Sequence, residues 1–146
     1  MSAVWEEAKA KGDIGESLFK LRFPNAKDVS NLREYQLIDV DFILGEHLIE
    51  VKYDSVIHRT GNMFVEDYTT IFNGNVHDGW YRITGADTLC YIDAEDDSAH
   101  FISMDTLRSY IEKRKPARAT CRPNNGNTIV GWLVPIARIP HKTIKL

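Results

Sequence analysis

Residues Leu37 to Asp54 read LIDVDFILGEHLIEVKYD, and this stretch decides the fold because its apolar and charged residues alternate almost strictly. Alternation with period two is typical of half-buried β-strands. Gly45-Glu46 lies in the middle and predicts a two-residue turn of type II′, which places a glycine first. The sequence therefore predicts a tight hairpin in which Leu44 faces His47.

The charged residues of this hairpin are expected on one face. Counting back from the turn along an antiparallel ladder places Asp41 opposite Glu50 and Asp39 opposite Lys52. Carboxylates that face each other directly repel, so the pair needs a positive charge between its members. A divalent cation would supply that charge. The ordinary alternative is that Glu50 and Lys52 form a structural ion pair on a solvated sheet face.

Length and composition indicate one globular domain over residues 1–146, with an ordinary apolar content of 43%. No apolar run is long enough to span a membrane, and the N-terminus lacks the pattern of a signal peptide. Cys90 and Cys121 form no metal-binding spacing, which argues against structural zinc and for a reducing compartment. We therefore expect a cytoplasmic protein without membrane contact.

Charge is distributed unevenly along the chain. Residues 106–146 carry nine Lys and Arg and one acid, a net charge of +8, whereas residues 1–105 carry nine bases and twenty acids, a net charge of −11. This distribution suits a polyanionic substrate, which the basic C-terminal segment would bind while the acidic part, with carboxylates that can hold a metal ion, would cut it. The alternative is that the basic residues are only the solvated face of a helix.

Hydrophobic periodicity predicts the other elements. A helix is expected over residues 3–22, strands over 63–71, 89–92, 100–103 and 128–136, a helix from Ser103 or Asp105 to Arg114, and loops over 27–33, 55–62 and 123–127. Within the first helix, Gly12-Asp13 is expected either to break the helix or merely to loosen it, and Asp13-x-x-Glu16 has the spacing of a capping box. Glu16 is therefore expected either to cap a helix or to present a carboxylate beside the hairpin.

Asp41, eight intervening residues and then Glu50-Val51-Lys52 resemble the D…(D/E)xK signature of the PD-(D/E)xK nuclease superfamily, which includes type II restriction endonucleases, archaeal Holliday junction resolvases and lambda exonuclease. GDIGE at 12–16 resembles the first-helix glutamate region of the resolvase-like members. RTGN at 59–62 and GWYRITGAD at 79–87 are similar to small phage-encoded members.

The tripeptide alone is not specific, because Glu7-Ala8-Lys9 also matches it on a polar helical stretch. The resemblance depends instead on an acid strand, a turn and the E-x-K strand together. It covers roughly residues 10–95. It implies an α/β fold with a restriction-endonuclease-like core, an αβββαβ-type order and a mixed central sheet flanked by helices.

The implied activity is hydrolysis of DNA phosphodiester bonds by a metal-dependent endonuclease. Carboxylates of Asp41 and Glu50 are hard ligands that suit Mg²⁺, with Mn²⁺ as a substitute, and by resemblance the carbonyl of Val51 completes the set. Lys52 would orient or deprotonate the attacking water, or bind the phosphate. Glu16 would be a further catalytic acid.

The surrounding residues are expected to have supporting roles. Asp39 would support the metal ligands without being one. Arg59, Asn62 and Arg82 lie beside the hairpin or within the resemblance and are expected to contact DNA phosphates. Glu66 and Asp67 on the third strand are candidates for further acids of the site, although a position at the surface is the first expectation.

Other functions fit the same residues. The protein could resolve Holliday junctions or other branched DNA, in which case we expect a symmetric homodimer. In a different class, it could be a non-catalytic DNA-binding accessory protein, or an inhibitor whose acidic surface mimics DNA. The similarity to phage-encoded members would place it in the host cytoplasm.

Overall fold

The computed structural model describes residues 3–123 and 126–146, with the side chains of residues 3–8 left out of the description. The expected loop at 123–127 therefore lies partly outside the described residues. The elements are α1 (Ala3–Arg22), β1 (Lys27–Asp28), α2 (Arg33–Gln36), β2 (Phe42–Leu44), β3 (His47–Asp54), α3 (Val56–Thr60), β4 (Asn62–Thr70), β5 (Val76–Asp78), α4 (Trp80–Ile83), β6 (Thr88–Asp93), β7 (Ser98–Ser103), α5 (Met104–Arg114), β8 (Arg118–Cys121), β9 (Thr128–Pro135), the 3-10 helix η1 (Ile136–Arg138) and β10 (Lys142–Lys145).

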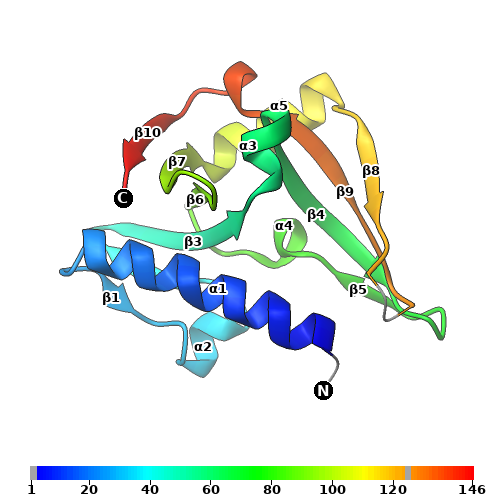
Figure 1. Cartoon of the computed structure of the whole chain (residues 1–146), viewed down its shortest axis with the longest axis horizontal. Coiled ribbons are helices and arrows are strands. Elements are labelled where there is room, and N and C mark those ends of the chain that lie inside the picture. Colours follow the sequence, from blue (N-terminus) through cyan, green and yellow to red (C-terminus); the bar gives the residue numbers. More distant parts are fainter. Residues whose placement is uncertain (1–2, 124–125) are drawn as a thin grey trace.

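The strands form two sheets. The six-stranded sheet has the order β1-β2-β3-β6-β7-β10, and its β3–β6 pair is parallel while its other pairs are antiparallel. The four-stranded sheet has the order β5-β4-β9-β8 and is antiparallel. Figure 1 shows β4 and β9 running together beside the first sheet, with α1 next to β3. The chain is thus α/β, with a mixed six-stranded sheet flanked by helices.

The predicted hairpin is confirmed in its register. Leu44 pairs with His47 and Phe42 with Ile49. Gly45 has φ +60°, which an L side chain adopts only with strain, so glycine suits this turn. The strand is shorter than expected, because β2 begins at Phe42, and Asp39 lies in a preceding turn with φ +53°. Asp39 therefore does not pair with Lys52 in the ladder, but the expected contact of the two side chains is present, at 3.9 Å between Oδ2 and Nζ.

The third expected strand is observed as β4, but it belongs to the second sheet. Along its length β4 pairs with β9, and its end pairs with β5. The free edge of β3 is taken by β6 in parallel register. Two parallel neighbours need a crossover connection, and residues 55–87 provide it with α3, β4, β5 and α4. Residues 56–60, expected in a loop, form a short helix that ends at Gly61.

Helix α1 is continuous through Gly12 and Asp13. The capping role considered for Glu16 is therefore wrong, since Asp13 lies inside the helix and not at its start. Gly15 explains how closely α1 packs, because a Cβ there would lie 2.8 Å from the Cβ of Tyr53 on β3. This approach brings Glu16 to the side of the hairpin.

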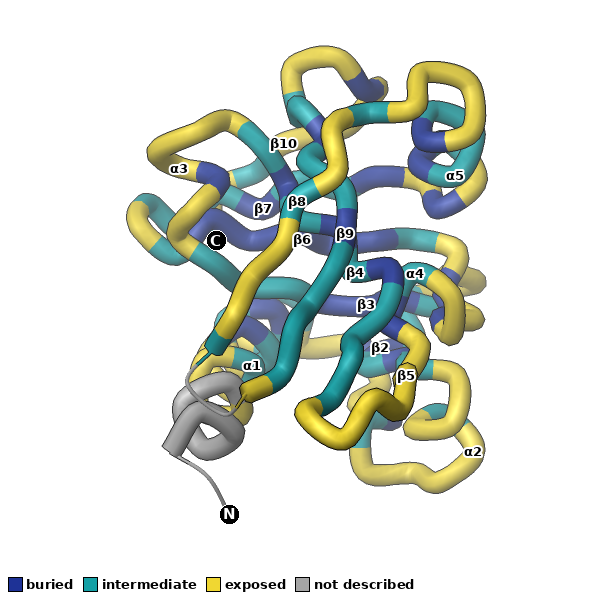
Figure 2. The backbone as a smooth tube through the Cα atoms, turned by 90° about the vertical axis from the view of Figure 1, so that its right-hand side faces the viewer, coloured by how far each residue is buried: buried dark blue, intermediate teal, exposed yellow. Residues whose placement is uncertain are grey.

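The core has a layer on each face of the six-stranded sheet. On one face, Met63 and Val65 of β4 pack with Tyr91 of β6 and Leu107 of α5, whereas Phe19 of α1 packs over the other face. Figure 2 shows β3 and β6 buried through the centre of the molecule, and β8 largely exposed at its outside. The E-x-K strand is therefore a central strand.

Candidate functional site

The carboxylate of Asp41 is fixed by the neighbouring strand. Its Oδ2 accepts a hydrogen bond of 2.8 Å from the backbone N–H of Val51, and its own N–H donates to the carbonyl of Ile49 at 2.9 Å. Burial raises the pKa of Asp41 to about 6, although the Val51 N–H and the charge of Lys52 oppose the rise. Asp41 thus holds a defined position next to β3.

Glu50 is the unusual member of the site, because its side chain is 0% exposed. Its Oε1 lies 3.0 Å from Nζ of Lys52, which makes an ion pair. Among the described residues, however, neither carboxylate oxygen has a hydrogen bond of acceptable geometry. Burial raises the pKa of Glu50 well above its usual range, and Lys52 opposes the rise. A buried carboxylate without full hydrogen bonding is costly unless something compensates it.

Lys52 is held between acids and an aromatic ring. Its ammonium lies 3.9 Å from Oδ2 of Asp39 and 5.4 Å from the ring centroid of Trp80. Burial lowers the pKa of Lys52, but the charges of Glu50, Asp39 and Glu66 outweigh burial and raise it above its usual value. The lysine is therefore a cation at neutral pH, oriented by several groups.

Glu16 reaches the same region from α1. Burial raises its pKa to about 7, and the negative charges of Asp41 and Asp28 add to the rise. Beside it lies a cavity of about 660 Å³, which Asp28 and Ser30 also line. The helix and the hairpin thus place several carboxylates near each other. A divalent cation would offset their repulsion, and oxygen donors of this kind suit Mg²⁺ or Mn²⁺.

Glu66 and Asp67, expected at the surface, are both partly or fully buried. Burial raises the pKa of Glu66, and the charge of Lys52 lowers it, which places this acid near the lysine. Asp67 is 6% exposed, and its carboxylate accepts hydrogen bonds from Arg82 Nε at 2.7 Å and from Arg118 NH2 at 2.9 Å. The sequence named Glu66 as a candidate further acid, but the expectation that it lies at the surface is wrong.

The three residues expected to contact DNA are not brought together. Arg82 is bonded to Asp67 and to Asp78, the latter at 3.2 Å, so a phosphate would have to share it with two acids. Arg59 is exposed on α3, and Asn62 is half-buried at the start of β4.

A second group of possible metal ligands lies outside the hairpin. Ligand atoms of His58, Asp93 and Asp96 all lie within 4.8 Å of one another. His58 Nδ1 is 2.9 Å from Asp93 Oδ2, and this hydrogen bond raises the pKa of the imidazole. The half-exposed imidazole is accounted for by that ion pair, and the group does not select Mg²⁺ in particular. Within the described part of the chain, Asp41, Glu50 and Glu16 do not meet the same 4.8 Å criterion.

Comparisons of the chain with family models, with curated proteins and with solved structures found no match. In the described residues, no helix is long and apolar enough to cross a membrane.

Proposed function

We propose that the protein is a Mg²⁺-dependent deoxyribonuclease with a restriction-endonuclease-like core. The observation that carries the proposal is the fully buried Glu50, whose oxygens lack well-formed hydrogen bonds and whose Oε1 lies 3.0 Å from Nζ of Lys52. Retaining in the core an acid whose oxygens lack well-formed hydrogen bonds costs stability, which is expected where a site serves a ligand. A helix, a hairpin and a parallel neighbour, namely α1, β2–β3 and β6, support the core assignment.

Each residue of the site has a role in this proposal. Asp41, Glu50 and the carbonyl of Val51 would hold the cation, which when bound neutralises charge on the phosphate and acidifies a water molecule. Lys52 would orient the attacking water or the phosphate, with Asp39 and the Trp80 ring fixing its position. Glu16 would add a carboxylate at the edge of the site.

One observation favours a non-catalytic alternative. Lys52 already forms a 3.0 Å ion pair with Glu50, as a purely structural pair would. A DNA-binding accessory protein or a DNA mimic would keep this pair and would bind no metal at the hairpin. Resolution of branched DNA is a narrower form of the enzyme proposal, and it requires a symmetric dimer.

The test is a cleavage panel of single-stranded, duplex, flapped and four-way DNA, with RNA as a control, in Mg²⁺, Mn²⁺ or EDTA. Asp41→Asn and Lys52→Gln are expected to lower the cleavage rate by about 100-fold or more. Asp97→Asn is the charge-matched control, since Asp97 lies in a turn with φ +58° that asparagine tolerates. Cleavage that survives in both site variants would overturn the proposal.

Metal binding separates the enzyme from its alternative. Calorimetry with Mn²⁺ should detect binding to the wild-type protein and to Asp97→Asn, but not to Asp41→Asn. His58→Gln is tested in parallel, because His58 belongs to the other possible ligand group. Binding that depends on His58 and not on Asp41 would count against a metal at the hairpin.

A further inference from the structure

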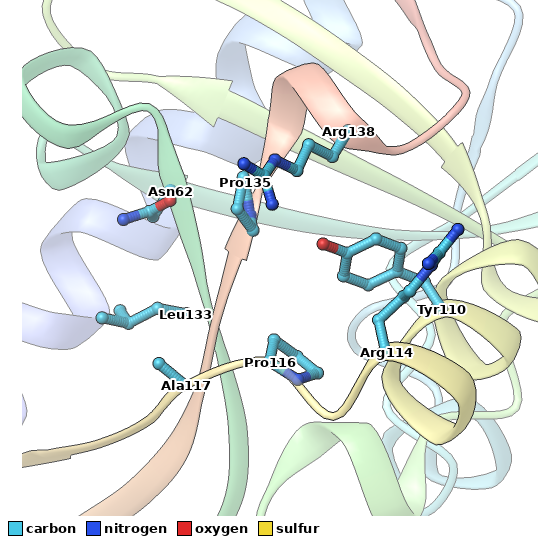
Figure 3. A pocket seen from close by; sticks show the side chains of 8 residues that line it. All are labelled: Asn62, Tyr110, Arg114, Pro116, Ala117, Leu133, Pro135 and Arg138. Carbon is cyan, nitrogen blue, oxygen red and sulfur yellow. The ribbon is translucent and has the colours of Figure 1, made fainter.

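A cavity of about 650 Å³ lies away from the hairpin, between the end of α5, the end of β9 and the start of β4. Figure 3 shows Tyr110 and Arg114 entering it from α5 and Arg138 from the segment after β9, with the tyrosine hydroxyl directed toward β9. The cavity is also lined by Asn62, Leu133 and Pro135. The cavity is therefore a polar hollow with a hydrophobic floor.

The charge of this cavity is positive and uncompensated. Two arginines and no acid line it. In the described part of the chain, neither Arg114 nor Arg138 has a carboxylate within ion-pair distance, whereas Arg82 and Arg118 both bind Asp67. An arginine fork, a phenol and an amide are donors that match the oxygens of a phosphate group.

A purely structural role accounts for one of the two arginines only. Arg114 lies in the last turn of α5, where a cation interacts favourably with the helix dipole. Arg138 belongs to the three-residue helix η1 and has no such reason to face the same hollow. Two cations from separate elements meeting at one cavity indicate an anionic ligand.

The cavity shares a face of β4 with the candidate site. Asn62 pairs with Pro135 and Glu66 with Gly131, and residues at even positions of this stretch point to one side of the strand. Glu66 is the acid near Lys52. Four residues of strand separate Asn62 from Glu66, a distance of about 13 Å.

We infer that this cavity binds a backbone phosphate of the DNA strand whose cleavage is proposed above, and the inference rests on that proposed function. Successive phosphates of one strand lie about 3.4 Å apart along the duplex axis. A separation of about 13 Å spans only a few nucleotides, so the phosphate in the cavity lies on the same stretch of strand as the bond at Lys52. Its contact would position the substrate without reading its sequence.

The test measures binding of a short labelled DNA duplex in EDTA over a range of salt concentrations, with Asp41→Asn as the parent protein so that no cleavage intervenes. The double variant Arg114→Gln/Arg138→Gln should reduce the slope of log K against log salt by about 0.9, because one phosphate contact is lost, and each single variant should reduce it by part of that amount. Arg33→Gln makes the same charge change on α2, at the opposite end of the molecule from α5 (Figures 1 and 2), and should leave the slope unchanged.

The outcomes separate the possible sources of the phosphate. Equal slopes in the Arg33, Arg114 and Arg138 variants overturn the inference. Binding of inorganic phosphate is measured by calorimetry. If both cavity variants lose this binding while their DNA slopes stay at the parent value, the ligand is a free phosphate and the inference is also overturned. If the slopes fall as expected but the wild-type protein cleaves no nucleic acid, the nuclease proposal fails while the DNA contact at the cavity stands.

Discussion

Replacing Gly15 with alanine is expected to destabilise the protein, although alanine is the better helix former. The new Cβ would lie 2.8 Å from the Cβ of Tyr53 and 3.5 Å from Cγ1 of Val51. Because the first of these atoms is attached to the backbone of β3, rotating a side chain does not relieve the clash. Overpacking costs about 2 kcal/mol and the gain in helix propensity returns about 1 kcal/mol, a net loss of about 1 kcal/mol.

Gly12 provides the matched control on the same helix. A Cβ at residue 12 meets no atom within 4 Å, so Gly12→Ala should gain about 1 kcal/mol. The free energies of unfolding, measured by urea denaturation, should therefore differ by about 2 kcal/mol between the variants. Equal gains would refute the close approach of α1 to β3. If the site is a nuclease, Gly15→Ala should also lower cleavage by displacing Glu16, and Gly12→Ala should not.

Three further changes test other contacts. Asp93 raises the pKa of His58, so the contribution of this ion pair to the free energy of unfolding is present below a pH of about 6.5 and is lost as the pH rises through the raised value. The difference in unfolding free energy between wild type and His58→Gln should therefore shrink at high pH. A difference that stays constant with pH would contradict this. Burial raises the pKa of Asp67, but its arginine partners outweigh burial and lower it. Asp67→Asn should therefore lower the free energy of unfolding, measured in urea at neutral pH, by about 2 kcal/mol. This loss should become smaller below a pH of about 4, where the carboxylate is protonated. Ser103 accepts a hydrogen bond from the N–H of Thr106 at the start of α5, so Ser103→Ala should cost about 0.5–1 kcal/mol, measured as a lower thermal midpoint.

The sequence predicted local structure where side-chain spacing determines it. The glycine of the turn sets the register of the hairpin, so the pairing of Leu44 with His47 followed directly. The strands around residues 89–92, 100–103 and 128–136, and the helix capped by Ser103, carried clear apolar patterns and were confirmed. Hydrophobic periodicity indicates which face of an element is buried, and it was sufficient to locate these strands and this helix.

Pairing between distant segments was not predictable in the same way. Nothing in the alternation of residues 63–71 indicated that β4 would pair with β9 and not with β3. The strands β1, β5, β8 and β10 are two to four residues long and mostly exposed, so they carry no apolar pattern.

The same limit applies to the site. The extent of α1 was predicted, but the close packing of Gly15 against β3 was not, because no local signal reveals that contact. The ion pair of Arg82 with Asp78 could have been suggested by their separation of four residues, although Asp78 ends β5 and Arg82 lies on α4. Its bond to Asp67 could not, because that contact depends on how β4 lies against α4.

The pairing of β4 with β9 also determines when the candidate site can form during synthesis. Asn62 must meet Pro135, and Glu66 must meet Gly131, so the second sheet closes only when nearly the whole chain has been made. The hairpin that carries Asp41 and Glu50 is completed within the first 54 residues. A ribosome-bound chain would therefore expose these carboxylates early, and Lys52 would acquire its neighbour on β4 only after the C-terminal strands emerge.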